Sequence, residues 1–191
     1  MTAEKQLSHD ELAGLIDYAL ELGLTRARRV ETGDIVVKDE VVYRWCAGCP
    51  EYGRNLSCPP AVEPPEKFRQ FLGSYRFGML VQLSHRLKED PAAAGYGEAY
   101  ELSTRLHLLL LALEDFCREN GYPRARCFIG GCCRLCGTCP GPGNHCLNPR
   151  EARSSMEANG ISVVETCAAA GWPLEFPVKD QVTWTGLVLL D

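Results

Sequence analysis

The sequence lacks the features that would place it at a membrane or on a nucleic acid. Its longest apolar run, residues 106–113, includes a histidine and falls far short of the roughly 20 residues of a membrane-spanning helix. Basic residues do not outnumber acidic ones, 20 against 25, so the net charge is −5. General nucleic-acid binders carry a basic face instead. We therefore expect neither a membrane nor a nucleic acid as a partner.

Signals for export and for common catalytic machinery are missing as well. Residues 1–10 are polar and contain no apolar signal core, so we expect a reducing, cytoplasmic location. No segment matches a P-loop, a dinucleotide fingerprint, a nucleophile elbow or a Ser-His-Asp set. The sequence thus assigns no catalytic residue. Nothing in it indicates an oligomeric state.

Cysteine, by contrast, is abundant, with eleven residues in a chain of 191. In a chain without export signals, cysteines are more often metal-binding or catalytic than disulfide-bonded. Four of them follow the pattern C-x2-C-x2-C-x6-C within residues 130–149, namely Cys133, Cys136, Cys139 and Cys146. Disulfides between thiols so close in sequence would be strained. The spacing instead lets the thiols converge on one inorganic centre, as in bacterial ferredoxins, and predicts a 4Fe-4S cluster.

A structural zinc site is the alternative for these four cysteines. Zinc sites usually present two separated pairs of ligands. Here Cys139 follows the Cys133 and Cys136 pair after only two residues, which is unusual for zinc and normal for a cubane cluster. The spacing therefore favours iron and sulfur over zinc.

A second cysteine loop, residues 46–60, supplies three thiols, Cys46, Cys49 and Cys58. We favour a second cluster here, whose fourth ligand would be Cys132, Cys127 or a cysteine of the other loop, since ferredoxins exchange ligands between neighbouring clusters. Alternatively, an iron with an open position would bind substrate or water. A third possibility is that both loops share one centre.

The other cysteines and the histidines have structural interpretations. Cys117 lies on the apolar stripe of an expected helix and Cys167 in an alanine-rich segment, so both are expected to be buried. His107 is expected in the core and His145 in an exposed loop.

Helices and strands alternate along the chain, which predicts one α/β domain over residues 1–191, with a mixed sheet flanked by helices and the cysteine loops at one end. We expect helices over residues 8–22, 64–72 and 98–120, and two short ones starting at the capping boxes Ser154/Glu157 and Ser162/Glu165. We expect a hairpin of residues 35–37 and 41–43, and strands at 77–83, 126–129 and 182–190. Residues 88–97 are expected to form a polar loop.

Three segments together resemble a family of bacterial and archaeal proteins described only as predicted metal-binding proteins, a domain of unknown function. The segments are Cys46-x2-Cys49 with Tyr52-Gly53 and Ser57-Cys58-Pro59-Pro60; Cys133-x2-Cys136-x2-Cys139; and Cys146-x2-Pro149 followed by Arg153-x-Ser155-Met156-Glu157-Ala158-x-Gly160-Ile161. The resemblance implies a cysteine-ligated metal centre, iron–sulfur in type, and no particular reaction.

The chain departs from the family pattern at three places. Asn159 stands where the family tends to carry a cysteine, Leu147-Asn148 replaces a basic pair, and Cys132 occupies a position that is normally small.

Three functional hypotheses follow from these cysteines. The first is a protein with one or two 4Fe-4S clusters that transfers electrons to a redox partner protein or serves a partner enzyme as a redox accessory. The second is an enzyme whose cluster has an open iron site for small-molecule chemistry. The third is a zinc-stabilised interaction module. A bound cluster with four thiolates would carry negative charge, which Arg134, Arg150 and Arg153 are placed to offset.

Overall fold

The four strands of the computed structural model form one sheet in the order β1-β2-β4-β3, where β1 is Arg26–Glu31, β2 is Phe77–Arg86, β3 is Arg126–Phe128 and β4 is Gln181–Leu190. The structure describes residues 9–87, 97–176, 178 and 181–191. The central strands β2 and β4 pair along their whole length, from Phe77 opposite Leu190 to Arg86 opposite Gln181. They carry most of the apolar residues of the sheet.

The α/β class is confirmed, but the expected mixed sheet is wrong, because every pair of named strands is antiparallel. The only parallel pairing recorded among the described residues is an isolated bridge between Ile129 and Ser155. Because β2 and β3 both run antiparallel to β4, they are parallel to each other, and α4 (Gly97–Glu119) connects them in a crossover past β4.

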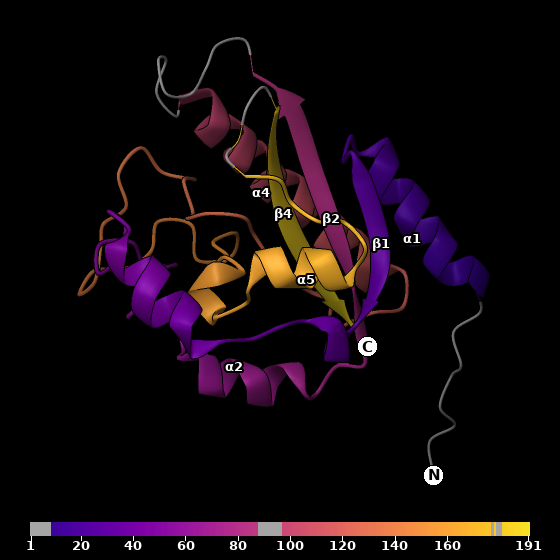
Figure 1. Ribbon diagram of the computed structural model, residues 1–191, viewed down its shortest axis with the longest axis horizontal. Coiled ribbons are helices and arrows are strands. Elements are labelled where there is room, and N and C mark those ends of the chain that lie inside the picture. Colours follow the sequence, from indigo (N-terminus) through magenta and orange to yellow (C-terminus); the bar gives the residue numbers. More distant parts are fainter. Residues whose placement is uncertain (1–8, 88–96, 177, 179–180) are drawn as a thin grey trace.

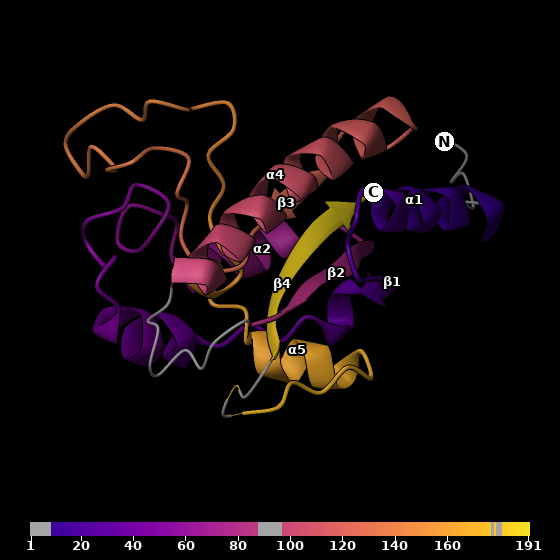
Figure 2. The same cartoon turned by 90° about the horizontal axis from the view of Figure 1, so that it is seen from above.

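Helices cover both faces of the sheet (Figures 1 and 2). On one face, α1 (His9–Glu21) and α4 (Gly97–Glu119) enclose a core that includes Leu106, Leu110 and Met79. On the other face, α2 (Pro65–Leu72) and α5 (Val163–Ala169) enclose a second core around Phe68, Leu187 and others. Burial of the sheet on both faces explains why β2 reads as a continuous apolar run rather than an alternating one.

Most of the strongly patterned elements form where the sequence predicts them. α2, α4, β2, β3 and β4 all overlap the expected ranges. α1 does so too, but Ser8, where its expected range begins, lies outside the described residues, as do residues 88–96 of the loop expected over 88–97. Gly97 belongs to α4 instead. None of the helices in the described part of the chain has the length and apolarity to cross a membrane.

The expected hairpin of residues 35–37 and 41–43 is wrong. Val37 pairs with Ile161, and the amide of Ser162 donates to the carbonyl of Val36 at 2.8 Å. Residues Val41–Trp45 form a π-helical turn, η2, that leads into the first cysteine loop. The segment thus finds its partner far along the chain instead of in its neighbour.

Of the two capping boxes, only the second begins an α-helix. Ser162 precedes α5, and its hydroxyl lies 3.2 Å from the Glu165 carboxylate. After Ser154 there is only a 3-10 turn, η4 (Glu157–Asn159), which ends at Gly160 in the left-handed conformation, with φ of 83°. The short helix expected to start at Ser154/Glu157 is therefore reduced to this turn.

Candidate metal centre

The two cysteine loops lie side by side at one end of the sheet (Figures 1 and 2). The first loop begins where η2 passes into a 3-10 turn, η3 (Cys46–Gly48), and continues through a series of tight turns. Gly53 has a φ of 70°, and its amide donates to the carbonyl of Pro59 at 2.8 Å, which closes the loop on itself. A glycine is the residue that adopts this backbone conformation without strain.

The second loop leaves β3 beneath the ring of Trp184. At Gly130 and Gly131 an added Cβ would lie 3.0 Å from that ring, so both positions require glycine for the close approach. Gly131 also has a φ of 74°. The loop then runs through the four cysteines of residues 133–146 without regular secondary structure.

Asn55 joins the two loops. Its side chain is 3% exposed, its Nδ2 donates to the carbonyl of Cys133 at 2.9 Å, and its Oδ1 accepts from the amide of Ser57. The amide of Leu56 in turn donates to the Cys139 sulfur at 3.4 Å. These contacts hold the backbone of Cys133 and the sulfur of Cys139 against the first loop.

The structure brings Cys133, Cys136 and Cys146 into one neighbourhood. Burial raises the pKa of the Cys133 thiol, and the nearby Cys136 and Cys146 raise it further. Asn148 connects the other two sulfurs, since its amide donates to Cys146 Sγ at 3.4 Å and its Nδ2 to Cys136 Sγ at 3.6 Å. With Leu56, the chain therefore directs N–H groups at three of the four sulfurs of this loop.

A second neighbourhood combines the first loop with Cys132 of the second. Cys58 and Cys132 are hydrogen-bonded, and this contact raises the pKa of Cys58 while it lowers that of Cys132. Cys49 acts electrostatically on both Cys46 and Cys58. Burial, aided by Glu157 and Cys49, raises the pKa of Cys46 to about 11.

The remaining cysteines belong to the cores. Cys117 and Cys167 are fully buried, as expected, on opposite faces of the sheet. Cys127, considered as an extra ligand, is fully buried in the core beside α4. Of the two candidate extra ligands, Cys132 is the one that the fold brings to the first loop.

All eleven cysteines are free thiols, so none is consumed in a disulfide. Cys46, Cys133, Cys136, Cys139 and Cys146 are half-buried, and Cys49 is exposed. Within the described residues, however, no group of three His, Cys, Asp or Glu side chains is already arranged to hold a metal ion. The loops supply suitable donors in two neighbourhoods, but in this conformation the sulfurs are not drawn together as a ligand shell.

The three arginines singled out from the sequence have different surroundings. Arg153 is buried and holds the carboxylate of Glu114 in α4, with Nε to Oε2 at 3.0 Å and Nη2 to Oε1 at 2.5 Å. The guanidinium carbon of Arg134 lies 4.1 Å from the ring centroid of Tyr100, and the charge of Arg134 lowers the pKa of Cys132. Arg150 is exposed. Arg134 is the arginine of the three whose charge reaches a loop thiol, whereas Arg153 anchors the segment after the loop.

The two histidines considered from the sequence, His107 and His145, lie as expected. His107 is buried, with its Nε2 at 2.9 Å from the carbonyl of Glu151, and His145 is exposed in the second loop.

Glu157 stands between the first cysteine loop and a cavity of about 730 Å³. Its backbone carbonyl accepts from Cys46 Sγ at 3.6 Å, and its carboxylate oxygen Oε2 is buried with no hydrogen-bond partner among the described residues. Burial raises the pKa of this carboxyl. The cavity is mainly apolar, and its walls include Trp45, Tyr100 and Trp184.

Sequence reasoning missed Asn55, Glu114 and the carboxyl of Glu157, and it noted Asn148 only as a departure from a basic pair. Their roles depend on contacts across the fold, such as Asn55 with Cys133, which a linear pattern does not show. For Asn148 a signal was present, because it stands two residues after Cys146, where its amide can fold back onto the sulfur.

Comparison with known proteins yields one family. A family model with the description "Predicted metal-binding protein (DUF2284)" matches residues 28–190, which includes both cysteine loops. No curated protein and no solved structure matches the chain.

Proposed function

The chain belongs to this family of predicted metal-binding proteins, and on that premise we propose that its two loops hold one or two 4Fe-4S clusters, through which it exchanges electrons with a partner protein. The observation that carries the proposal is the set of N–H donors from Leu56 and Asn148 aimed at the sulfurs of Cys136, Cys139 and Cys146. Such donors stabilise thiolate ligands and tune the metal that they hold.

The chain offers a ligand set for each centre. Cys133, Cys136, Cys139 and Cys146 would hold the first cluster, and Cys46, Cys49, Cys58 and Cys132 the second. A bound cluster supplies reversible one-electron chemistry. Because the described residues contain no preformed ligand group, the thiols must rotate inward, and metal binding would be coupled to ordering of the loops.

Exposed apolar side chains next to the loops support the presence of a partner protein. Tyr43 is 62% exposed, Trp45 77% and Leu147 67%, and all three adjoin or lie within the cysteine loops. Aromatic residues are enriched in protein interfaces. A partner that contacts these side chains would approach the clusters closely.

The proposal is tested by anaerobic reconstitution with iron and sulfide. We expect a visible chromophore that bleaches on reduction with dithionite and gives a paramagnetic resonance signal. Cys136→Ser should weaken both signals. Cys167→Ser is the matched control, because that sulfur lies near Gln82 and Thr185 in the core, where a hydroxyl fits.

Equal signals in the two variants would contradict the ligand assignment. A colourless protein that takes up zinc and no reducible iron would replace the redox function with the zinc-stabilised interaction module.

The cavity beside Cys46 favours a second candidate, an enzyme with an open iron position in the first loop. A hollow of about 730 Å³ is large enough for a small substrate, and Glu157 supplies a polar group within it. Cyanide added to the reduced protein should alter the resonance signal if an iron is open. An unchanged signal would indicate full thiolate ligation and exclude this candidate.

A further inference from the structure

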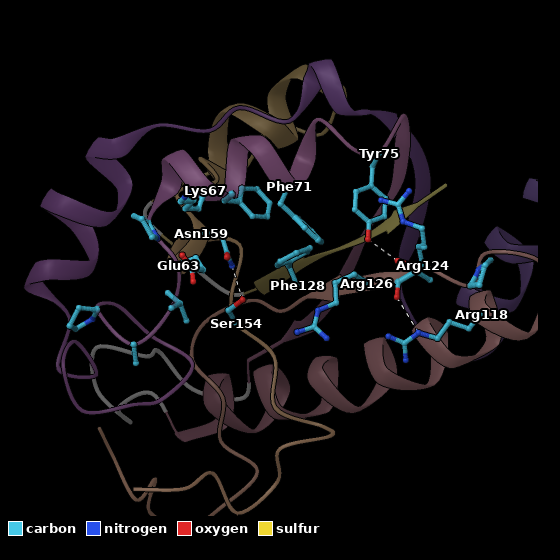
Figure 3. Close-up of a pocket in the computed structure, with 17 residues that line it drawn as sticks. Glu63, Lys67, Phe71, Tyr75, Arg118, Arg124, Arg126, Phe128, Ser154 and Asn159 are labelled. Atoms are coloured by element: carbon cyan, nitrogen blue, oxygen red, sulfur yellow. Dashed lines mark hydrogen bonds between the residues drawn. The ribbon is translucent and has the colours of Figure 1, made fainter. Parts of the chain in front are cut away.

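A second hollow, of about 890 Å³, lies between α2, β3 and the C-terminal end of α4, outside both cysteine neighbourhoods. Figure 3 shows Phe71, Phe128, Ser154 and Arg126 gathered around it, with Lys67 and Glu63 toward one side and Arg118 and Arg124 toward the other. Its walls come from α2, β3 and the end of α4, and also from Pro60–Pro64, where the first cysteine loop ends, and from Ser154 and Asn159.

The charge of this hollow is opposite to that of the whole chain. Four cationic side chains and one acidic side chain line it, although the chain carries a net charge of −5. The cations are Lys67, Arg118, Arg124 and Arg126, and the acid is Glu63. A concave surface lined by one sign of charge concentrates ligands of the other sign.

Two of the four cations are already neutralised. Arg118 pairs with Glu114 and Asp115, and Arg124 pairs with Asp191 at 3.2 Å. Neither is therefore a strong anchor for a further anion.

The other two cations are available. Within the described residues, the side chains of Arg126 and Lys67 have no hydrogen-bond or ion-pair partner. Arg126 is half-buried on β3, so its guanidinium carries a charge that nothing on this wall balances. A guanidinium presents planar N–H donors that match carboxylate and phosphate oxygens.

An aromatic surface adjoins these cations. Phe71 is 40% exposed, and its ring centroid lies 5.1 Å from that of Tyr75 and 6.3 Å from that of Phe128. Both of these neighbours are buried. The buried rings hold Phe71 in place at the wall of the hollow. Flat ligands stack on aromatic rings.

We propose that this hollow binds a small aromatic molecule with an anionic group, which stacks on Phe71 and pairs its phosphate or carboxylate with Arg126 and Lys67. The volume lies in the range of small-molecule sites.

Calorimetric titration of the full chain tests the proposal with four probes. Adenosine monophosphate and benzoate carry ring and charge together, adenosine carries the ring alone, and inorganic phosphate carries the charge alone. We expect at least one of the first two to bind saturably, and about tenfold tighter than adenosine or phosphate, since a hydrogen-bonded charge contributes on this scale. Whichever of the two binds identifies phosphate or carboxylate as the recognised group.

Variants separate the two halves of the site. Arg126→Gln should weaken the aromatic anion about tenfold and leave adenosine unchanged, whereas Phe71→Ala should weaken both. Arg105→Gln is the matched control, because Arg105 is exposed on α4 and does not line the hollow. Thermal melts of each variant verify that the fold is intact.

Three results would overturn the proposal. One is that no probe binds, another is that inorganic phosphate binds as tightly as the aromatic anions, and the third is that Arg105→Gln weakens binding as much as Arg126→Gln. None of these three results would affect the proposal of iron–sulfur clusters, which is tested separately by iron content and by the visible chromophore.

Discussion

Glu114 and Arg153 form a buried ion pair that ties α4 to the segment after the second cysteine loop. Glu114 is 0% exposed and Arg153 5%. The same carboxylate accepts from the amide of Cys127 at 2.5 Å, so one side chain holds a helix, a strand and the end of a loop. A buried ion pair adds little to the free energy of unfolding compared with apolar residues packed in its place. Removal of only one partner, however, is strongly destabilising.

We therefore expect Arg153→Met to lower the free energy of unfolding by about 1–3 kcal/mol, since the buried carboxylate loses two hydrogen bonds and keeps only Arg118 and the amide of Cys127 as partners. Urea denaturation measures the change. Lys38→Met is the control, because Lys38 and Glu165 form an exposed pair at 2.7 Å whose loss should matter little. Equal losses in the two variants would contradict the role of the buried pair.

The same pair predicts a dependence on pH. Burial alone would raise the pKa of Glu114, but the hydrogen bonds from Arg153 and Cys127 and the charge of Arg153 outweigh it, so the pKa lies below its ordinary value. The stability that this carboxylate contributes is therefore present above its unfolded pKa of about 4.3 and is lost as the pH falls below it. Urea denaturation between pH 6 and 3 should show a shallower acid loss for Glu114→Gln than for the unaltered chain. Parallel curves would contradict this assignment.

Asn148 should tune the proposed first cluster through its side chain. Its Nδ2 donates to Cys136 Sγ at 3.6 Å, and hydrogen bonds to ligand sulfurs raise the reduction potential. We expect Asn148→Ala to lower the midpoint potential in a potentiometric titration. Asn144→Ala is the control, since Asn144 lies in the same loop and donates to the carbonyl of Pro140 instead of to a sulfur. A rise, or an equal shift in both variants, would contradict the contact.

Among the elements, β2 and β4 pack so closely that a side chain at one position is excluded. A Cβ at Gly78 would lie 2.7 Å from the backbone oxygen of Val188 in the neighbouring strand. We expect Gly78→Ala to cost about 1–3 kcal/mol, because backbone cannot move aside cheaply. Gly14→Ala in α1 should stabilise by about 0.5–1 kcal/mol, since nothing lies within 4 Å of its added Cβ and alanine favours a helix. Chemical denaturation measures the free energy of unfolding of both variants, which should fall for Gly78→Ala and rise for Gly14→Ala. A stabilising Gly78→Ala would contradict the close packing of β2 and β4.

The elements that the sequence predicts well are those whose own pattern is strong. α4 has a wide apolar stripe, and β2 and β4 are apolar runs bounded by polar residues, so their formation follows from local chemistry. β1 was missed because its sequence, RARRVE, is polar and it lies at the edge of the sheet with one buried residue. Residues 35–37 were read as part of a hairpin because their partner, Ile161, lies far along the chain.

The candidate metal centre likewise has features that the sequence predicts and features that it does not. Seven loop cysteines were predicted as ligands from their spacing, because ligand chemistry fixes residue type and interval, whereas Cys132 was only one of several candidates for an additional ligand. The grouping of the loop cysteines could not be predicted from the sequence. It depends on contacts such as Asn55 with Cys133 and Cys58 with Cys132, which form only when the two loops meet.

On the scale of the whole molecule, one turn separates two cavities. Glu157, at the start of η4, lines the apolar cavity beside Cys46, and Asn159, at its end, lines the cationic hollow under α2. Both cavities thus adjoin the end of the sheet where the cysteine loops lie. This arrangement gathers the proposed clusters and the proposed ligand site in one part of the fold.

The content of iron, acid-labile sulfide and zinc per chain after anaerobic purification distinguishes bound clusters from a zinc site. We predict iron and sulfide in equal amounts, at about four or eight of each per chain, with loss of at least one cluster in Cys136→Ser. Stoichiometric zinc without sulfide, or a chain that binds no metal under these conditions, would contradict this prediction.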